Sequence, residues 1–201
     1  MFPLGTALLP GQPLPLQVFE PRYVAMMRDV VGSDRRFGAV LIERGSEVGG
    51  GEHRFTAGTT AEVAQVGAED GVVGLVAVGA ERFEVETWLP DDPYPRAEVR
   101  RLPDLTWSGE DHERLADTER VVRRALAVMS EHRSQVWPAD VELADDPVAR
   151  SWQLAWLSPL GALDQLTLLR STSPGELLET TARLTSDAVE LLRLQMPDDP
   201  A

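Results

Sequence analysis

The 201-residue sequence contains no cysteine and no lysine, because all 19 of its basic residues are arginine. Without cysteine the chain has no thiol nucleophile, no disulfide and no thiolate zinc site. A phosphate-binding P-loop needs a lysine that reaches the β and γ phosphates, and a Ser-Lys peptidase needs lysine as its base. These two absences exclude a P-loop ATPase and a Ser-Lys peptidase from these residues.

Long apolar runs and a basic leader segment are missing as well. No stretch approaches the ~20 uninterrupted apolar residues that a membrane span requires. Four prolines interrupt every apolar run near the amino terminus that could imitate a signal peptide: Pro3, Pro10, Pro13 and Pro15. We therefore expect a cytoplasmic protein with no membrane partner, and the lack of cysteine fits a reducing compartment.

Positive charge is scarce relative to negative charge, since 33 acidic residues outnumber 19 arginines and give a net charge of −14. The excess is spread along the chain, so neither half is a cationic partner for phosphate groups. Nucleic acid is therefore a disfavoured partner. Nucleic acid would become a plausible partner only if several arginines converged on one face. The candidates for such a basic stripe are Arg35, Arg36, Arg54, Arg96, Arg100 and Arg101.

Histidine is also rare, and no nucleophile motif is present. His53, His112 and His132 are scattered, and the last two lie near opposite ends of one predicted helix, too far apart to share a metal. The sequence has no Gly-x-Ser-x-Gly elbow. We expect no metal site, no cofactor and no catalytic residue.

The residues up to Pro103 show the hydrophobic period of two that is typical of strands. Five short runs are of strand type: residues 14–18, 37–42, 60–66, 72–78 and 82–88. The prolines of the first run predict an edge strand or a strand start. Pro21 can open a helix with apolar residues at helical spacing, namely Tyr23, Met26, Met27, Val30 and Val31. Glu20 and Arg22 are expected to fix the corner before this helix, although they could also clamp a ligand. The expected arrangement is a small barrel plugged by one helix.

After Pro103 the period becomes that of a helix, so we divide the chain near residue 105. The predicted helices cover residues 109–132, 146–157, 160–169 and 173–195. Asp146 followed by Pro147 predicts a capped helix start, and Ser173 with Glu176 predicts a capping box. The predicted inward face of the last helix consists of Leu177, Leu184, Ala188, Val189, Leu191 and Leu192. The fold class is therefore α+β, with a β-rich barrel over residues 1–104 and a helical bundle over 105–201.

Ordered motifs run through the whole chain. They are Phe2-Pro3-Leu4, Leu9-Pro10-Gly11, Leu14-Pro15-Leu16, Val18-Phe19-Glu20-Pro21-Arg22-Tyr23, Phe37-Gly38, Ala57-Gly58-Thr59-Thr60-Ala61, Gly79-Ala80-Glu81-Arg82-Phe83, Pro93-Tyr94-Pro95, Asp146-Pro147, Leu163-Asp164-Gln165-Leu166 and Leu177-Leu178-Glu179 with Arg183-Leu184. In this order they resemble the amino-terminal, substrate-binding domain of ATP-dependent Lon proteases. The resemblance implies a PUA-like β pseudo-barrel followed by a helical bundle. It also implies a non-catalytic module that binds unfolded or degron-bearing polypeptides, with a separate protease as a candidate partner.

Four aromatic residues are the candidate peptide-binding residues. Trp88, Tyr94 and Trp107 lie in the proline-rich segment between barrel and bundle, and Trp137 lies in a polar segment between helices. Large apolar groups on such segments either hold the two halves together or face a partner. Packing is the simpler interpretation, and binding is the hypothesis to test. The edge strand Leu14 to Val18 is a further candidate, because an edge strand or an apolar groove can accept a peptide by strand addition or by side-chain pockets. The alternative function is an RNA- or small-ligand-binding PUA-like domain.

Overall fold

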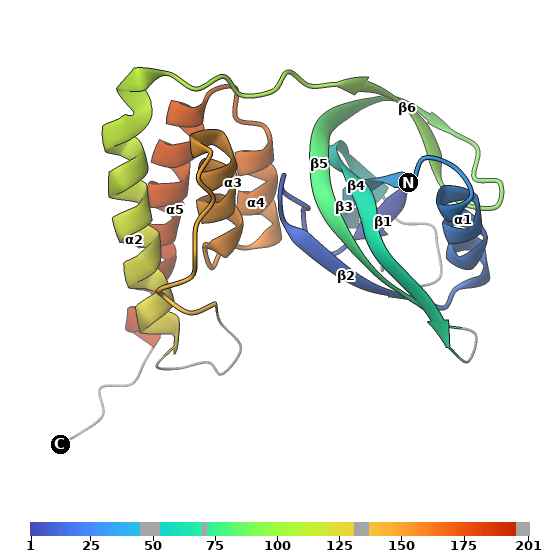
Figure 1. Ribbon diagram of the computed structural model, residues 1–201, viewed down its shortest axis with the longest axis horizontal. Coiled ribbons are helices and arrows are strands. Elements are labelled where there is room, and N and C mark those ends of the chain that lie inside the picture. The colour runs from blue at the N-terminus through green and yellow to red at the C-terminus, as the bar shows by residue number, and fades with distance from the viewer. Residues whose placement is uncertain (45–52, 70–71, 131–136, 196–201) are drawn as a thin grey trace. The chain divides into compact units, whose positions relative to one another are not determined.

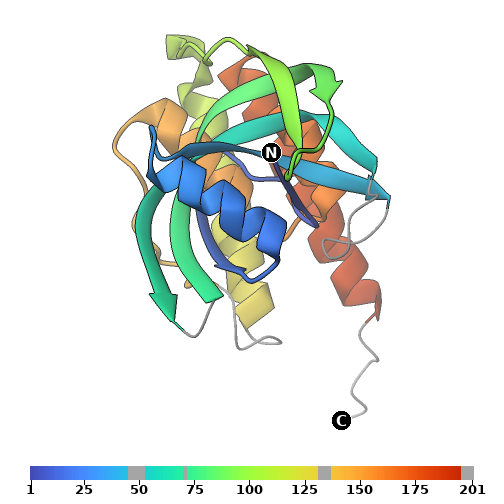
Figure 2. The same cartoon turned by 90° about the vertical axis from the view of Figure 1, so that its right-hand side faces the viewer.

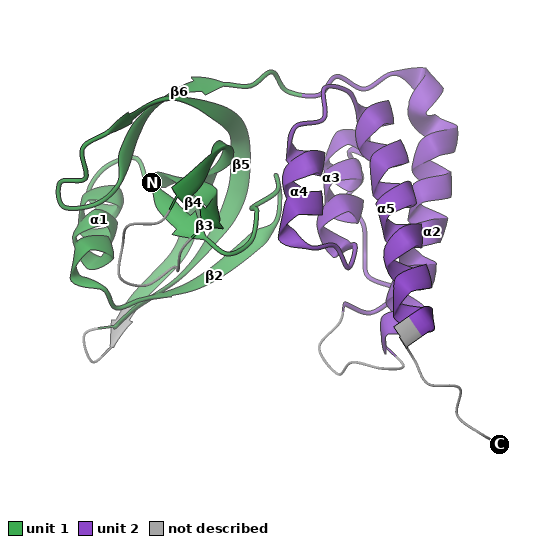
Figure 3. Cartoon of the chain, turned by 180° about the vertical axis from the view of Figure 1, so that it is seen from behind, with its two compact units in different colours: residues 1–104 green, residues 105–201 purple. Residues whose placement is uncertain are grey.

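The computed structural model describes residues 1–44, 53–69, 72–130 and 137–195. It divides the chain into two compact units, residues 1–104 and residues 105–201 (Figure 3). The predicted helix end at residues 131 and 132, with His132, lies outside the described residues. Within the described ranges, none of the helices has the length and apolar character that would let it cross a membrane.

Unit 1 is built on a six-stranded mixed sheet that curves strongly, like a barrel seen end-on in Figure 1. Its strands are β1 (Phe2–Leu4), β2 (Pro13–Val18), β3 (Arg36–Arg44), β4 (His53–Glu69), β5 (Val72–Leu89) and β6 (Arg96–Arg101). The strand order is β1-β3-β4-β5-β2, and β6 also pairs with β5. The β1–β3 pair is parallel and the other pairs are antiparallel. β2 pairs with β5 alone among the described strands, which confirms the edge position that its prolines predict.

One long strand, β5, replaces the two strands that the sequence predicts at residues 72–78 and 82–88. Its first half pairs with β2 and its second half with β6. Gly79 lies between these halves, where its N–H donates to the carbonyl of Gln12 (3.0 Å) and its carbonyl accepts from the N–H of Gly11 (2.8 Å). A Cβ at Gly79 would overlap the carbonyl oxygen of Leu9. Glycine thus permits the close approach of the loop before β2 and keeps β5 continuous.

Helix α1 (Pro21–Val31) lies against the curved sheet in Figures 1 and 2 and buries one face in the core of unit 1. The buried residues of this core are Phe2, Leu4, Leu8, Leu14, Val18, Tyr23, Met26, Met27, Val30, Phe37, Ala39, Ala61, Val63, Leu75 and Ala77. The predicted helical stripe is confirmed except at Val31, which is 39% exposed. Val31 is the last residue of the helix, where the chain turns away into Gly32.

The corner before α1 is held by an ion pair, in line with the structural interpretation of Glu20 and Arg22. Arg22 Nε lies 3.3 Å from Glu20 Oε2, and both side chains are largely buried. The Glu20 side chain makes no cap hydrogen bond. Its backbone carbonyl instead accepts from the N–H groups of Tyr23 (3.0 Å) and Val24 (2.9 Å). The first turn is therefore satisfied by the backbone rather than by the carboxylate.

Unit 2 is helical throughout its regular structure. Its elements are η1 (Gly109–Asp111), α2 (His112–Ser130), α3 (Pro147–Leu157), α4 (Ala162–Leu169) and α5 (Pro174–Gln195). The predicted cap of α3 is present, because Asp146 Oδ1 accepts from the N–H of Ala149 at 2.8 Å. At the start of α5, Ser173 Oγ accepts from the N–H of Glu176 (3.1 Å). The return bond differs from a capping box, since Glu176 Oε2 accepts from Thr172 rather than from Ser173 (2.7 Å).

The buried face of α5 differs from the predicted one. Leu177 and Leu178 are buried, and so are the polar residues Thr181 and Thr185, whereas Leu191 is 57% exposed. The hydroxyl of Thr185 donates to Ser158 Oγ at 3.0 Å, which lets a polar side chain occupy a buried position. Hydropathy alone assigns threonine to solvent and leucine to the core. The buried face of α5 can therefore be predicted only when the positions of the neighbouring helices are known.

Candidate functional site

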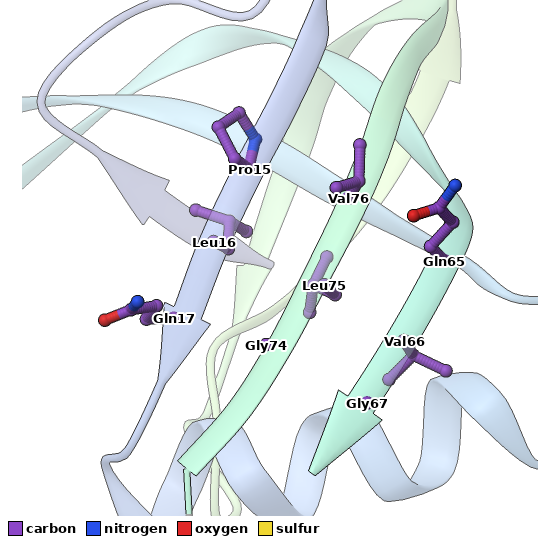
Figure 4. Close-up of a pocket in the computed structure, with 9 residues that line it drawn as sticks. All are labelled: Pro15, Leu16, Gln17, Gln65, Val66, Gly67, Gly74, Leu75 and Val76. Carbon is purple, nitrogen blue, oxygen red and sulfur yellow. The ribbon is translucent and has the colours of Figure 1, made fainter. Parts of the chain in front are cut away.

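An open groove of about 630 Å³ lies on three neighbouring strands of unit 1, β2, β5 and β4 (Figure 4). Its nine lining residues are Pro15, Leu16, Gln17, Gln65, Val66, Gly67, Gly74, Leu75 and Val76. None of them carries a charge, although the chain as a whole has a net charge of −14. A groove of this size and neutral lining is suited to apolar or amide-containing ligands.

The groove opens on the side of the sheet that faces away from the core. Leu75 is buried in the core of unit 1, and its partner on β2, Leu16, packs against the same core. Successive side chains alternate between the two faces of a strand, and paired residues share a face. The neighbouring rows therefore point outward, and they are Pro15–Val76–Gln65 and Gln17–Gly74–Gly67.

Two glycines form the floor of the groove. Gly67 and Gly74 are direct partners across β4 and β5, and both are exposed. A Cβ at either position would meet no atom within 4 Å. Val76 and Pro15 supply an apolar wall on one side of this floor, and Gln17 lies beside it on β2. The concavity thus arises because two residues without side chains are brought opposite each other.

The free edge of β2 is poorly suited to the addition of another strand. Pro13 and Pro15 have no N–H group, so a partner strand would lose donors along this edge. Phe19, which follows β2, is 58% exposed. Its Cα lies within about 7 Å of that of Gln17, because a single residue, Val18, separates them. Side-chain insertion into the groove, rather than strand pairing, is the mode of binding that this surface favours.

Trp88 is half-buried in unit 1, at the margin of a second apolar cluster. This cluster contains Val40, Phe83 and Val85. The guanidinium carbon of Arg54 lies 5.0 Å from the centre of the Trp88 ring, within the range of a cation–π interaction. The ring thus has partners within the protein, and its role in peptide binding stays a prediction.

Tyr94 is also half-buried and packs against the core of unit 1. Its hydroxyl donates to Asp29 Oδ2 at 2.8 Å, linking the segment before β6 to α1. This hydrogen bond raises the pKa of the Tyr94 phenol above its ordinary value. The structure shows a packing role for Tyr94, and a binding role in addition stays a prediction.

Trp107 and Trp137 lie in unit 2. Trp107 packs at the margin of the core formed by α2, α3 and α5, and Trp137 lies in the segment before α3. Trp107 is half-buried and meets the ring of His112 edge-on, with ring centres 5.3 Å apart. Trp137 is 47% exposed and meets Trp156 edge-on at 5.6 Å. Trp137 is therefore the most accessible of the four predicted residues, and a binding role for either ring stays a prediction.

The groove itself was missed from the sequence. The sequence indicates one side of it, the candidate edge strand Leu14 to Val18, which supplies Pro15, Leu16 and Gln17 to the lining. Gly67 and Gly74 are seven positions apart, and their pairing depends on the register of the β4–β5 hairpin. That register includes a shift between Val63 and Gln65, which no hydrophobic period reveals.

The arginines that could have formed a basic stripe are mostly paired with carboxylates. Arg36 contacts Glu62 and Glu81, and Glu62 raises the pKa of the guanidinium. The other pairs are Arg54–Asp91 (3.3 Å), Arg100–Glu86 (3.4 Å) and Arg101–Asp104 (2.7 Å). Local neutralisation of this kind leaves less positive charge for the phosphates that RNA binding would require. Within the described ranges, no group of three or more histidine or carboxylate side chains is arranged as metal ligands would be.

The chain resembles known Lon proteins over nearly its whole length. A family model of the ATP-dependent protease La (LON) substrate-binding domain matches residues 1–187. A Lon protease of Methylocella silvestris is 27% identical over 198 residues, which cover 94% of this chain and 24% of that protein. Protein cereblon of Danio rerio is 37% identical over 102 residues, 48% of this chain and 23% of that protein. The chain thus spans about a quarter of the length of these curated relatives.

Solved structures of Lon amino-terminal domains have the same fold. A Lon N-terminal domain protein from Xanthomonas campestris is 25% identical with a TM-score of 0.60, covering 98% of this chain and 96% of that chain. The N-terminal domain of a Mycobacterium avium complex Lon protease has a TM-score of 0.64 at 19% identity, covering 92% and 97%, and shows likeness of fold. Neither the ATPase nor the protease part of Lon is found in these 201 residues. The match over residues 1–187 shows that the chain belongs to the Lon substrate-binding domain family.

Proposed function

We propose that this protein binds unfolded or degron-bearing polypeptides through the groove on β2, β5 and β4. One observation carries the proposal: a substrate-binding domain with a net charge of −14 holds an open groove lined by nine uncharged residues. Folded proteins bury most of their large apolar side chains, whereas unfolded segments expose them. A neutral groove therefore distinguishes unfolded segments from the charged surfaces of folded proteins.

A polypeptide in the groove would also reach Phe19, which lies outside the groove lining but only two positions beyond Gln17 in the chain. A phenylalanine that is 58% exposed contributes little to the stability of its own domain and is available to a ligand. The contact area is small, and a flexible partner loses conformational entropy when it is ordered. We expect a dissociation constant of about micromolar or weaker.

The partner that we infer beyond the bound polypeptide is a protease that receives it. The Lon protease of Methylocella silvestris contains a corresponding region as 24% of its length. A module of this kind has no need of a nucleophile or of a nucleotide site of its own. It acts by holding an unfolded segment near a protease, in the cytoplasm.

The proposal is tested with one polypeptide in two states. Reduced, carboxymethylated α-lactalbumin is unfolded, and the native disulfide-bonded protein is its folded counterpart. Titration calorimetry should show binding of the unfolded form at about micromolar concentration and no binding of the native form. Phe19→Ser should raise the dissociation constant for the unfolded form several-fold, because it removes one apolar side chain that contacts the ligand.

Val31→Ser is the matched control, because Val31 is an exposed apolar residue of unit 1 at the end of α1, whereas Phe19 directly follows the groove strand β2. It should bind like the wild type. Equal binding of the native and unfolded forms, or no binding of either, would contradict the proposed function. Equal weakening by the two serine variants would mean that apolar surface in general, rather than the groove, takes the ligand.

A further inference from the structure

We infer that the groove selects polypeptide segments by one uncharged aromatic side chain, which lies over the paired glycines Gly67 and Gly74. This inference rests on the proposed function and names the feature of the substrate that is recognised. It is carried by three properties of the groove: its uncovered glycine pair, its dimensions and its lack of charge.

The glycine pair is the first property. A glycine in a strand interior leaves the backbone without side-chain cover and weakens the strand, and it often marks a place where a ligand approaches closely. In designed sheets an aromatic ring packed over such a glycine restores the lost contacts. No aromatic residue lines this groove, and the space above both glycines is open. A ligand can therefore supply the ring that the protein does not.

The dimensions of the groove are the second property. It crosses three strands, about 10 Å at the usual spacing, and extends over three residues of each strand, about 7 Å. Gln17 and Gln65 stand at opposite corners of this area and offer amide donors and acceptors to the backbone of a bound segment. An aromatic ring fills such a shallow area with few rotatable bonds to immobilise.

The lack of charge is the third property and decides which side chains are rejected. A lysine, arginine or carboxylate placed over the glycines would lose hydration, and no lining residue could act as its counter-ion. Long aliphatic side chains are tolerated but lose more rotamer freedom than a ring. The groove therefore favours phenylalanine, tyrosine and tryptophan in segments that carry no charge beside them.

The test uses a peptide panel and a variant that fills the groove. The peptides are short, uncharged Ser/Thr/Gly sequences that differ only at a central residue, which is Trp, Phe, Ala, Lys or Glu. Gly74→Val places a side chain on the floor, where its Cβ would meet no atom within 4 Å. Because valine favours strands and reduces the entropy of the unfolded chain, this variant should be at least as stable as the wild type. Thr87→Val, at an exposed position near the other end of β5, is the matched control.

For the wild type and Thr87→Val we expect the Trp and Phe peptides to bind about tenfold or more tightly than the Ala, Lys and Glu peptides. Gly74→Val should lose this preference while its melting temperature is unchanged or raised. Undiminished binding of the Trp peptide by Gly74→Val overturns the inference, and so does equal binding of the charged peptides.

Two further outcomes separate this inference from the proposed function. If no peptide of the panel binds but unfolded α-lactalbumin does, the aromatic preference is wrong and the proposed function stands. If the wild type self-associates in sedimentation and Gly74→Val does not, a second copy of this chain, through its exposed Phe19, occupies the groove. That result also overturns the inference, because the ring would then come from this protein and not from a substrate.

Discussion

Two glycines of the same strand should respond in opposite ways to the same substitution. In β5, Gly79 faces the carbonyl oxygen of Leu9, whereas Gly74 faces open space. We expect Gly79→Ala to destabilise unit 1 strongly. Gly74→Ala should be neutral or stabilising by about 0.4–1 kcal/mol, because alanine reduces the entropy of the unfolded chain.

The size of the loss at Gly79 can be worked out from its contacts. Relief of the overlap with Leu9 requires the loop of residues 9–12 to move away from β5. That movement breaks two backbone hydrogen bonds, to Gly11 (2.8 Å) and to Gln12 (3.0 Å), each contributing about 0.5–1.5 kcal/mol. Overpacking in a buried position adds about 1–3 kcal/mol. The free energy of unfolding should therefore fall by about 2–6 kcal/mol.

Urea unfolding followed by circular dichroism measures the difference between the two variants. Hydrogen exchange of peptides from β2 and β5 then locates the weakened region. The separation between the variants should be at least about 2 kcal/mol. If Gly79→Ala unfolds within about 0.5 kcal/mol of Gly74→Ala, the close approach at Gly79 does not exist and the account of β5 as one strand loses its support.

Five substitutions at four residues test the packing and the capping of unit 2. Asp146→Ala should cost about 1 kcal/mol in urea unfolding, whereas Asp146→Ser should retain most of the stability because serine can cap α3. Hydrogen bonds from Thr172 lower the pKa of the Glu176 carboxyl, so its stabilising effect is present above the unfolded value of 4.5 and is lost as pH falls through the folded pKa. The difference in melting temperature between wild type and Glu176→Gln should accordingly shrink on acidification from pH 7 to pH 3, and a constant difference would contradict the capping role. Trp152→Ala should lower the free energy of unfolding, measured with urea, by about 3–5 kcal/mol, because the Trp152 side chain is buried and only 5% exposed. Trp137→Ala should lower it by less than about 1 kcal/mol. Similar losses from both would show that Trp137 is a core residue.

Local rules allowed several elements to be predicted from the sequence. The alternation in residues 14–18 gave the strand and, through its prolines, its edge position. The start of α3 was set by Asp146 and Pro147, and the buried stripe of α1 by its helical spacing. Each of these depends on residues within one or two turns of one another. Sequence neighbours supply all the partners that such features need, so no tertiary information was required.

The groove and the charge pairing were decided by the tertiary structure. Gly67 and Gly74 become a groove floor only through the register of β4 on β5, and Pro15 joins them only because β2 pairs on the other side of β5. Arg36 is neutralised partly by Glu81, 45 positions away in the sequence. Neither a hydrophobic period nor a motif contains this information, because it resides in which strands are neighbours. The sequence by itself therefore determined the types of element and the family resemblance, while the strand pairing determined which side chains share a surface.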